Sequence, residues 1–208
     1  MNKTRLENYA KLIVKSGLNI QQGQEVLIQC GLDQPDFVTM VVEECYKAGA
    51  KRVTVKWSHM PVSKLNYMYR SLETLSEFTE IERAEWQNRV DKLPCLLWLD
   101  SDDPDGLAGT DSAKIASANM ARYPSIKPFR DAIENKYQWC IAAVPGKEWA
   151  KKIFPDLSAE EAVEKLWDAI LKCSRVTDDP VAEWDNHNKN LAMRCKFLND
   201  YRFDKLEY

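Results

Sequence analysis

Four short, almost wholly apolar segments, separated by stretches with helical spacing, constrain the fold of this chain most strongly. They are residues 24–30, 52–57, 94–99 and 138–144, and their composition is typical of strands buried on both faces of a sheet. A helix that begins near Asp33 and Pro35 and ends at Gly49 joins the first two, and such a crossover makes its two strands parallel. We therefore predict an α/β fold: an open, mostly parallel sheet of about four or more strands, flanked by helices on both faces.

Helical patterns fill the rest of the first two thirds of the chain. Thr4 and Glu7 form a predicted capping box, and Gly17 ends the first helix. The chain is helical from Pro61 to about Lys92, and two separate helices are expected over 111–122 and 126–136. The predicted core contacts of the 61–92 region are Leu72, Leu75, Phe78, Ile81, Trp86 and Val90.

Residues 145–173 contain the clearest local signals. A short helix is stopped by Pro155, and Ser158 with Glu161 forms a capping box for a longer one. A last, long helix is expected to begin at Asp179 and Pro180, followed by a strand-like segment over 203–208. The series Trp149, Trp167 and Trp184 is interpreted as core packing and not as a stacking platform for bases. The predicted apolar stripe of the last helix is Trp184, His187, Leu191, Cys195 and Leu198.

Composition describes an ordinary globular chain. Its 29 basic and 32 acidic residues give a net charge of −3, which provides no reason to expect nucleic acid or an anionic membrane as a partner. The first fifteen residues are rich in charge and the apolar runs are too short to cross a bilayer, so we expect a soluble, cytoplasmic protein. Six widely spaced cysteines without a Cys-x-x-Cys motif are expected to be buried free thiols: Cys30, Cys45, Cys95, Cys140, Cys173 and Cys195.

In an open parallel sheet, ligands bind outside the carboxyl ends of the strands. The loops that follow the four predicted strands are 31–34, 58–62, 100–109 and 145–148. None has the spacing of a phosphate-binding loop, and the chain has no Gly-x-Ser-x-Gly nucleophile motif. Lys147 and Glu148, at the end of the fourth strand, are the residues of the 145–173 region whose replacement we expect to affect substrate entry.

The acidic cluster after the third strand has two interpretations. A hard cation such as calcium or magnesium takes several carboxylate oxygens, but an EF-hand register would place Ser112 where a glutamate is needed. A solvated turn that caps the next helix is the favoured interpretation, with metal binding as the weaker alternative. The cluster consists of Asp100, Asp102, Asp103 and Asp105.

The two histidines lack the close spacing, such as His-Glu-x-x-His, that is typical of a catalytic zinc site with about three protein ligands. His59 follows a strand, where a catalytic role is conceivable, but it has no partner in sequence and is interpreted as a surface loop residue. His187 is expected to be a hydrogen-bonded histidine at a helix interface. The residues alone thus predict an α/β domain without a visible active site.

A family resemblance adds a function. Trp-Ala-Lys-Lys-Ile-Phe-Pro-Asp-Leu-Ser at 149–158 and Glu-Lys-Leu-Trp-Asp-Ala-Ile at 164–170 resemble the metallo-aminopeptidases of the aminopeptidase T, AmpS and PepS type. The opening at 9–26, the crossover at 44–53 and the Asp-Pro-Val-Ala-Glu-Trp run at 179–184 are similar to the same family. The resemblance thus extends along the whole chain.

The resemblance implies a cytosolic, dimeric exopeptidase that removes N-terminal residues from peptides with two divalent metal ions, zinc or cobalt. The family's ligands follow the point where this sequence ends, so no catalytic, substrate-binding or metal residue is assigned here and no cofactor is expected in this chain. Residues 1–178 would form the N-terminal α/β domain, and 179–208 would lead to a catalytic domain. The alternative is a stand-alone α/β binding or interaction module without catalysis.

Overall fold

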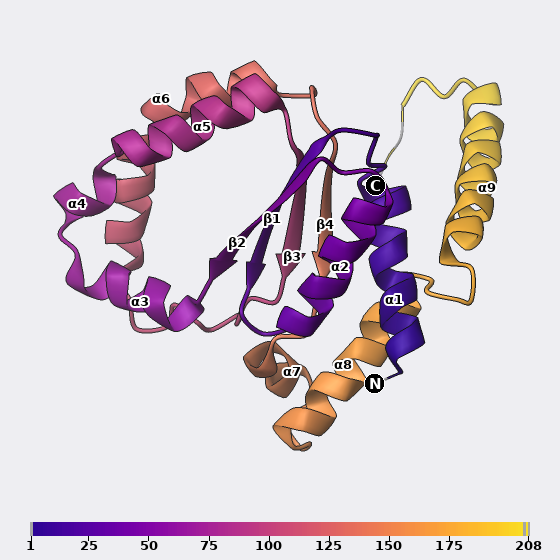
Figure 1. The fold of residues 1–208 in the computed structure, drawn as a ribbon, viewed down its shortest axis with the longest axis horizontal. Helices are drawn as coiled ribbons and strands as arrows, with labels where there is room; N and C mark the ends of the chain where they lie inside the picture. Colours follow the sequence, from indigo (N-terminus) through magenta and orange to yellow (C-terminus); the bar gives the residue numbers. More distant parts are fainter. Residues whose placement is uncertain (1, 206, 208) are drawn as a thin grey trace.

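The computed structural model describes residues 2–205 and 207. Its strands are β1 (Glu25–Gly31), β2 (Arg52–Ser58), β3 (Cys95–Asp100) and β4 (Trp139–Ala143). They form one sheet in the order β2-β1-β3-β4, and every neighbouring pair is parallel (Figure 1). The predicted open parallel sheet is confirmed, with all four strands at the predicted segments.

The hydrophobic core lies on one face of this sheet, under α1 (Lys3–Leu12), α2 (Pro35–Lys47) and α8 (Ala159–Cys173) (Figure 1). At its centre the Phe37 ring lies 5.5 Å from that of Tyr9 and 5.1 Å from that of Trp167. Such aromatic pairs add about 0.5–1.5 kcal/mol each beyond the burial of their area. Trp167 is buried, and Trp149 and Trp184 are partly buried against the same core, so the predicted packing role of the three tryptophans is confirmed.

Four helices form an arc on the opposite side of the sheet (Figure 1). The Phe129 ring packs 6.0 Å from Phe78 and 6.4 Å from Trp86, which ties the arc together. Two predicted core residues of this region, Leu72 and Ile81, are instead exposed, because the arc packs mainly on itself and buries little of its surface. The helices are α3 (Met60–Tyr69), α4 (Leu72–Ser76), α5 (Glu80–Lys92) and α6 (Ser112–Ile133).

The arc does not cover the second face of the sheet completely, contrary to the prediction that both faces are buried. Trp98 is 45% exposed, and Trp139 and Ile141 are each 64% exposed. These three side chains lie on one face of the sheet. Trp98 of β3 is paired with Ile141 of β4, and Trp139 lies two residues before Ile141, so its side chain points to the same face. Apolar strand composition therefore predicts two apolar faces correctly, but it does not tell whether this chain covers both.

Helix α6 corrects a second prediction. It runs unbroken from Ser112 to Ile133 through Pro124 and Pro128, where two helices were expected. Both prolines are exposed and lie four residues apart, so they occupy one outer face of the helix. The carbonyl groups that lose a partner there face water, and the Phe129 contacts hold the inner face in place.

Helix ends follow the sequence closely over residues 145–173. The short helix α7 (Lys147–Ile153) ends just before Pro155, and the capping box of α8 is present with both of its hydrogen bonds, between Ser158 and Glu161. At the N-terminus, however, Asn2 caps α1 by accepting from the Thr4 N–H, so the predicted box of Thr4 and Glu7 is wrong. A π-helical segment, η1 (Ile13–Gly17), extends α1 to the predicted glycine.

The last helix, α9 (Pro180–Asp200), begins at the predicted residues, with Asp179 as its cap. The predicted apolar stripe of α9 is packed only near the start of the helix. Further along the helix, Leu191, Cys195 and Leu198 are exposed. The strand-like segment expected over 203–208 is not a strand in residues 203–205 and 207, and residues 206 and 208 lie outside the described part. The division of the chain at residue 178 stays a prediction.

All six cysteines are unpaired. Cys30, Cys45 and Cys95 are buried as expected, and burial raises the pKa of the Cys45 thiol to about 12. Cys173 and Cys195 are exposed, contrary to the prediction, because they lie on the outer faces of α8 and α9.

Candidate functional site

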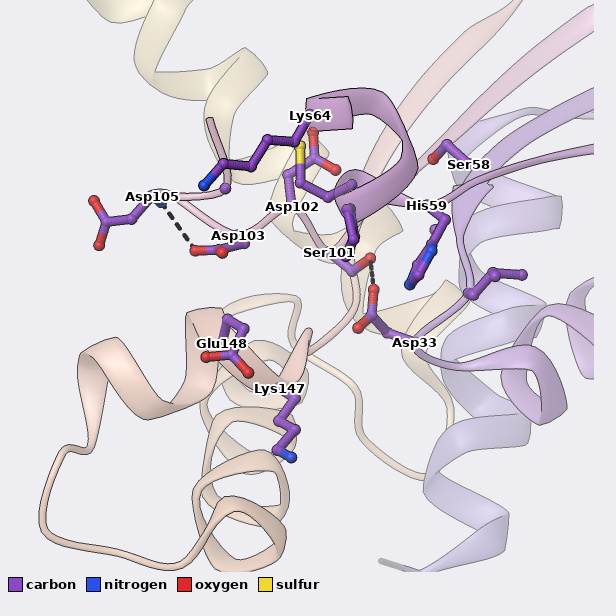
Figure 2. Close-up of a pocket in the computed structure, with 15 residues that line it drawn as sticks. Asp33, Ser58, His59, Lys64, Ser101, Asp102, Asp103, Asp105, Lys147 and Glu148 are labelled. Atoms are coloured by element: carbon purple, nitrogen blue, oxygen red, sulfur yellow. Dashed lines mark hydrogen bonds between the residues drawn. The ribbon is translucent and has the colours of Figure 1, made fainter. Parts of the chain in front are cut away.

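A polar hollow of about 470 Å³ lies at the carboxyl ends of the strands. Loops after all four strands contribute to it, as the rule for parallel sheets predicts. The structure therefore brings together His59, Lys147, Glu148 and most of the aspartate cluster, which are far apart in sequence (Figure 2). The hollow is lined by Gly31, Leu32, Asp33, Ser58, His59, Met60, Pro61, Lys64, Ser101, Asp102, Asp103, Asp105, Gly106, Lys147 and Glu148.

A partly buried hydrogen bond joins two of these loops. The Ser101 hydroxyl donates to the Asp33 carboxylate at 2.6 Å, and Ser101 is only 4% exposed (Figure 2). The sequence predicts that α2 begins near Asp33, but Gln34 takes the cap position, and the Gln34 side chain donates to the Pro145 carbonyl at 3.0 Å. Sequence reasoning missed the pair because Asp33 and Ser101 follow different strands, and only the order β1-β3 makes them neighbours.

Two glycines allow the loops to approach this closely. A Cβ atom on Gly31 would lie 2.6 Å from the Ser101 hydroxyl oxygen and 2.9 Å from an Asp33 carboxylate oxygen. A Cβ atom on Gly146 would lie 2.1 Å from the Ser101 backbone oxygen. All three distances are below van der Waals contact, so larger residues would push β1, β3 and the loop after β4 apart.

The electrostatics of the hollow are predominantly acidic. Burial, and then the neighbouring carboxylates of Asp100 and Asp33, raise the pKa of Asp102. Lys152 of α7 places its amino group 2.7 Å from both carboxylate oxygens of Asp105, which lines the hollow. Lys64 and Lys147 supply further positive charge, although the Lys147 side chain points away from the Ser101–Asp33 pair in Figure 2.

The aspartate cluster is a turn, as the favoured interpretation predicts. The Asp103 carboxylate accepts from the Asp105 N–H at 2.9 Å, and its carbonyl accepts from the Gly106 N–H at 3.0 Å. Asp100 likewise accepts from the Asp102 N–H at 3.1 Å. The expected capping role belongs to Asp111 instead, which accepts from the Lys114 N–H at 3.0 Å.

Possible metal-binding side chains are not clustered in the described part of the chain. Among residues 2–205 and 207, no group of three or more His, Cys, Asp or Glu side chains is arranged to hold a metal ion. His187 lies outside the hollow on α9, where its ring packs edge-on against Trp184 at 5.4 Å. Its side chain has no hydrogen bond to the other described residues, unlike the prediction. The hollow can thus bind a polar ligand through hydrogen bonds and charge, and the Ser101 hydroxyl is already committed to Asp33.

Comparison with known proteins identifies the class to which this fold belongs. The family model for peptidase M29, described as thermophilic metalloprotease, matches residues 2–208. The chain therefore belongs to the M29 metallopeptidase family, as the sequence resemblance implied.

Named relatives are aminopeptidases. The chain is 35% identical to aminopeptidase PepS of Streptococcus thermophilus, an alignment that covers 99% of this chain and 51% of that protein. It is also 35% identical to aminopeptidase AmpS of Bacillus subtilis, with 98% and 50% covered. The solved structure of wild-type AmpT from Thermus thermophilus superposes with a TM-score of 0.85 at 30% identity, covering 97% of this chain and 50% of that one. The chain thus spans about half the length of its relatives and corresponds to their N-terminal half.

Within the described part of the chain, every helix is too short or too polar to cross a lipid bilayer.

Proposed function

We propose that this chain is the N-terminal, non-catalytic half of a dinuclear metal-dependent aminopeptidase that removes N-terminal residues from peptides. Its main support is the match of residues 2–208 to the M29 family together with the coverage of only about half of each named relative. The ligands of the two zinc or cobalt ions would then belong to the other half. Two such ions activate a water molecule and stabilise both the attacking and the leaving group.

The residues of this chain would bind and orient the peptide. The hollow lies where parallel sheets bind ligands, and its lining combines carboxylates with the amino groups of Lys64 and Lys147. We place Lys147 and Glu148 at the path of substrate entry, because both lie at its rim after β4. The six unpaired cysteines are consistent with a reducing cytoplasm, and the family resemblance favours a homodimer.

A peptidase assay tests whether this half is non-catalytic by itself. The purified 208-residue chain is incubated with zinc or cobalt and an aminoacyl-anilide substrate, beside full-length AmpS of Bacillus subtilis as the positive control. We expect no release of the N-terminal residue by the chain alone. Metal-dependent release by this chain would show that it is catalytic by itself and overturn the proposal.

A joined polypeptide tests whether this chain supports peptidase activity when the second half is present. Residues 1–208 followed by the second half of Bacillus subtilis AmpS should release N-terminal residues, and Lys147→Ala with Glu148→Ala should raise KM more than they lower kcat. If the double variant has unchanged kinetics, residues 145–173 are scaffold alone.

A stop codon directly after Tyr208 in the source gene would favour the stand-alone binding module, for which the polar hollow is the candidate binding surface.

A further inference from the structure

The outer edge of β4 has unpaired backbone groups. β4 is the last strand of the sheet, and the Val144 N–H donates to the Asp100 carbonyl at 2.8 Å, so even-numbered residues here pair with β3. Backbone direction alternates along a strand, so Trp139, Ile141 and Ala143 direct their N–H and C=O groups outward. The Tyr9 hydroxyl donates to the Ala143 carbonyl at 3.1 Å. Among the described residues, the outward groups of Trp139 and Ile141 have no hydrogen-bond partner.

The two edges of the sheet differ in how they are protected. Edge strands usually carry charges, a proline or a bulge, which prevent pairing with another chain. The other edge, β2, carries Arg52 and Lys56, and Lys56 forms an ion pair with Glu85 of α5. Residues 138–144 contain no charge and no proline, and β4 pairs with β3 without a break in register. The edge of β4 is therefore suited to pairing.

A groove of about 390 Å³ runs along this edge, and its lining includes Tyr9, Leu12, Cys140, Ile141, Trp184 and Asn188. Its walls come from α1, η1 and the start of α9. A single strand adds to a sheet at a spacing of about 4.8 Å, whereas a second sheet with its own helices needs far more room. With α9 as a wall, the groove suits one extended segment better than β4 of a second copy.

We propose that β4 receives a fifth strand, and that this strand comes from the second half that the aminopeptidase relatives carry beyond the region matched by this chain. The inference rests on the proposed function, because it requires that second half. Relatives are about twice as long as this chain. Pairing would satisfy the free groups of Trp139 and Ile141, and apolar side chains at alternate positions would lie beside the bare face formed by Trp98, Trp139 and Ile141.

Peptides from that half test the pairing on the chain as it exists. Overlapping synthetic peptides of roughly 12 residues, long enough for one strand, span the part of Bacillus subtilis AmpS beyond its matched region. Each is added to the 208-residue chain, and amide hydrogen exchange is followed residue by residue. We expect one peptide to bind and to slow exchange at Trp139 and Ile141. N-methylation of alternate residues of that peptide should abolish the effect, because it removes the donors that pair with β4.

Two variants of one residue separate pairing from stability. Ile141→Pro removes the outward donor without removing a hydrogen bond to β3, and proline is tolerated at such edge positions. It should weaken binding of the peptide by about tenfold or more. Ile141→Val keeps the donor and a β-branched side chain, and should bind as the wild type does. Urea unfolding of both variants checks that the sheet is intact.

Several outcomes would overturn the inference: no peptide of the set binds, Ile141→Pro binds as tightly as Ile141→Val, or the slowed amides lie outside β4. A second copy of the chain would be the partner instead if, without peptide, amide exchange at Trp139 and Ile141 became slower as the protein concentration rose. Failure of the proposed function is separately visible, because it is measured as release of amino acids by the joined polypeptide and not by exchange at β4.

Discussion

At the scale of single residues, the most constrained positions surround Ser101. Its hydroxyl donates a hydrogen bond to Asp33, and its backbone oxygen faces Gly146. Gly31 leaves room for the side chains of Ser101 and Asp33. The two glycines differ in what an added methyl group would meet. At Gly31 it would meet the ends of two side chains, whereas at Gly146 it would meet the backbone of Ser101.

This difference gives a prediction with a built-in control. Gly146→Ala should lower the free energy of unfolding by about 1–3 kcal/mol, because the backbone of Ser101, directly after β3, cannot move away without disturbing the sheet. Gly31→Ala should cost about 1 kcal/mol, since the Ser101 and Asp33 side chains can rotate and lose one hydrogen bond. Urea unfolding of both variants measures the two costs. Equal costs, or a larger cost at Gly31, would contradict the steric account.

At the scale of elements, α6 shows tertiary contacts overriding a local signal. Pro124 and Pro128 each remove a backbone donor, and the sequence predicts a break between residues 122 and 126. The helix continues because Phe129 packs against Phe78 and Trp86. Proline at the first turn of α9 has no such cost, because the N–H groups there have no partner within the helix.

Replacing each kind of proline tests this explanation. Pro124→Ala should raise the free energy of unfolding by about 1–2 kcal/mol, because it restores a hydrogen bond inside α6. Pro180→Ala at the start of α9 should give no gain and should lose some packing, since Pro180 is buried. Thermal unfolding followed by circular dichroism measures both. A destabilised Pro124→Ala variant would mean that the bend at this proline is required for packing of the arc.

At the scale of the whole molecule, the two faces of the sheet are unequal. One face carries the core, with β1 and β3 in its middle, while the arc from α3 to α6 lies on the other side and leaves part of the second face exposed (Figure 1). Neither α3 nor α5 has a buried residue. Lys56 of β2 and Glu85 of α5 form an ion pair that links the arc to the sheet, but both side chains are partly exposed, and such pairs contribute little.

The arc should therefore open independently of the sheet. Amides of α3 and α5 are expected to exchange at least roughly tenfold faster than those of β1 and β3, because helices without buried residues open at a lower free energy than that of global unfolding. Native-state hydrogen exchange of the 208-residue chain measures both rates. Uniform protection across the arc and the sheet would show that they unfold as one cooperative unit.

The site was predictable in position but not in its contacts. The loops after the four strands were identified from sequence, because parallel strands place their carboxyl ends at one edge. That His59, Lys147 and Glu148 share a hollow follows from this rule. The bond from Ser101 to Asp33 does not, because it depends on β3 lying beside β1.

The sequence by itself determined the four strands, most helix ends, the capping box of Ser158 and the family, because these depend on local pattern and on runs of identical residues. Only the tertiary structure decided that α6 continues through its prolines, that Asp33 accepts a hydrogen bond from Ser101, and that Trp98, Trp139 and Ile141 remain exposed. The physical reason is that apolar composition indicates which surfaces are favourable to bury. Whether they are buried depends on which elements, of this chain or another, pack against them.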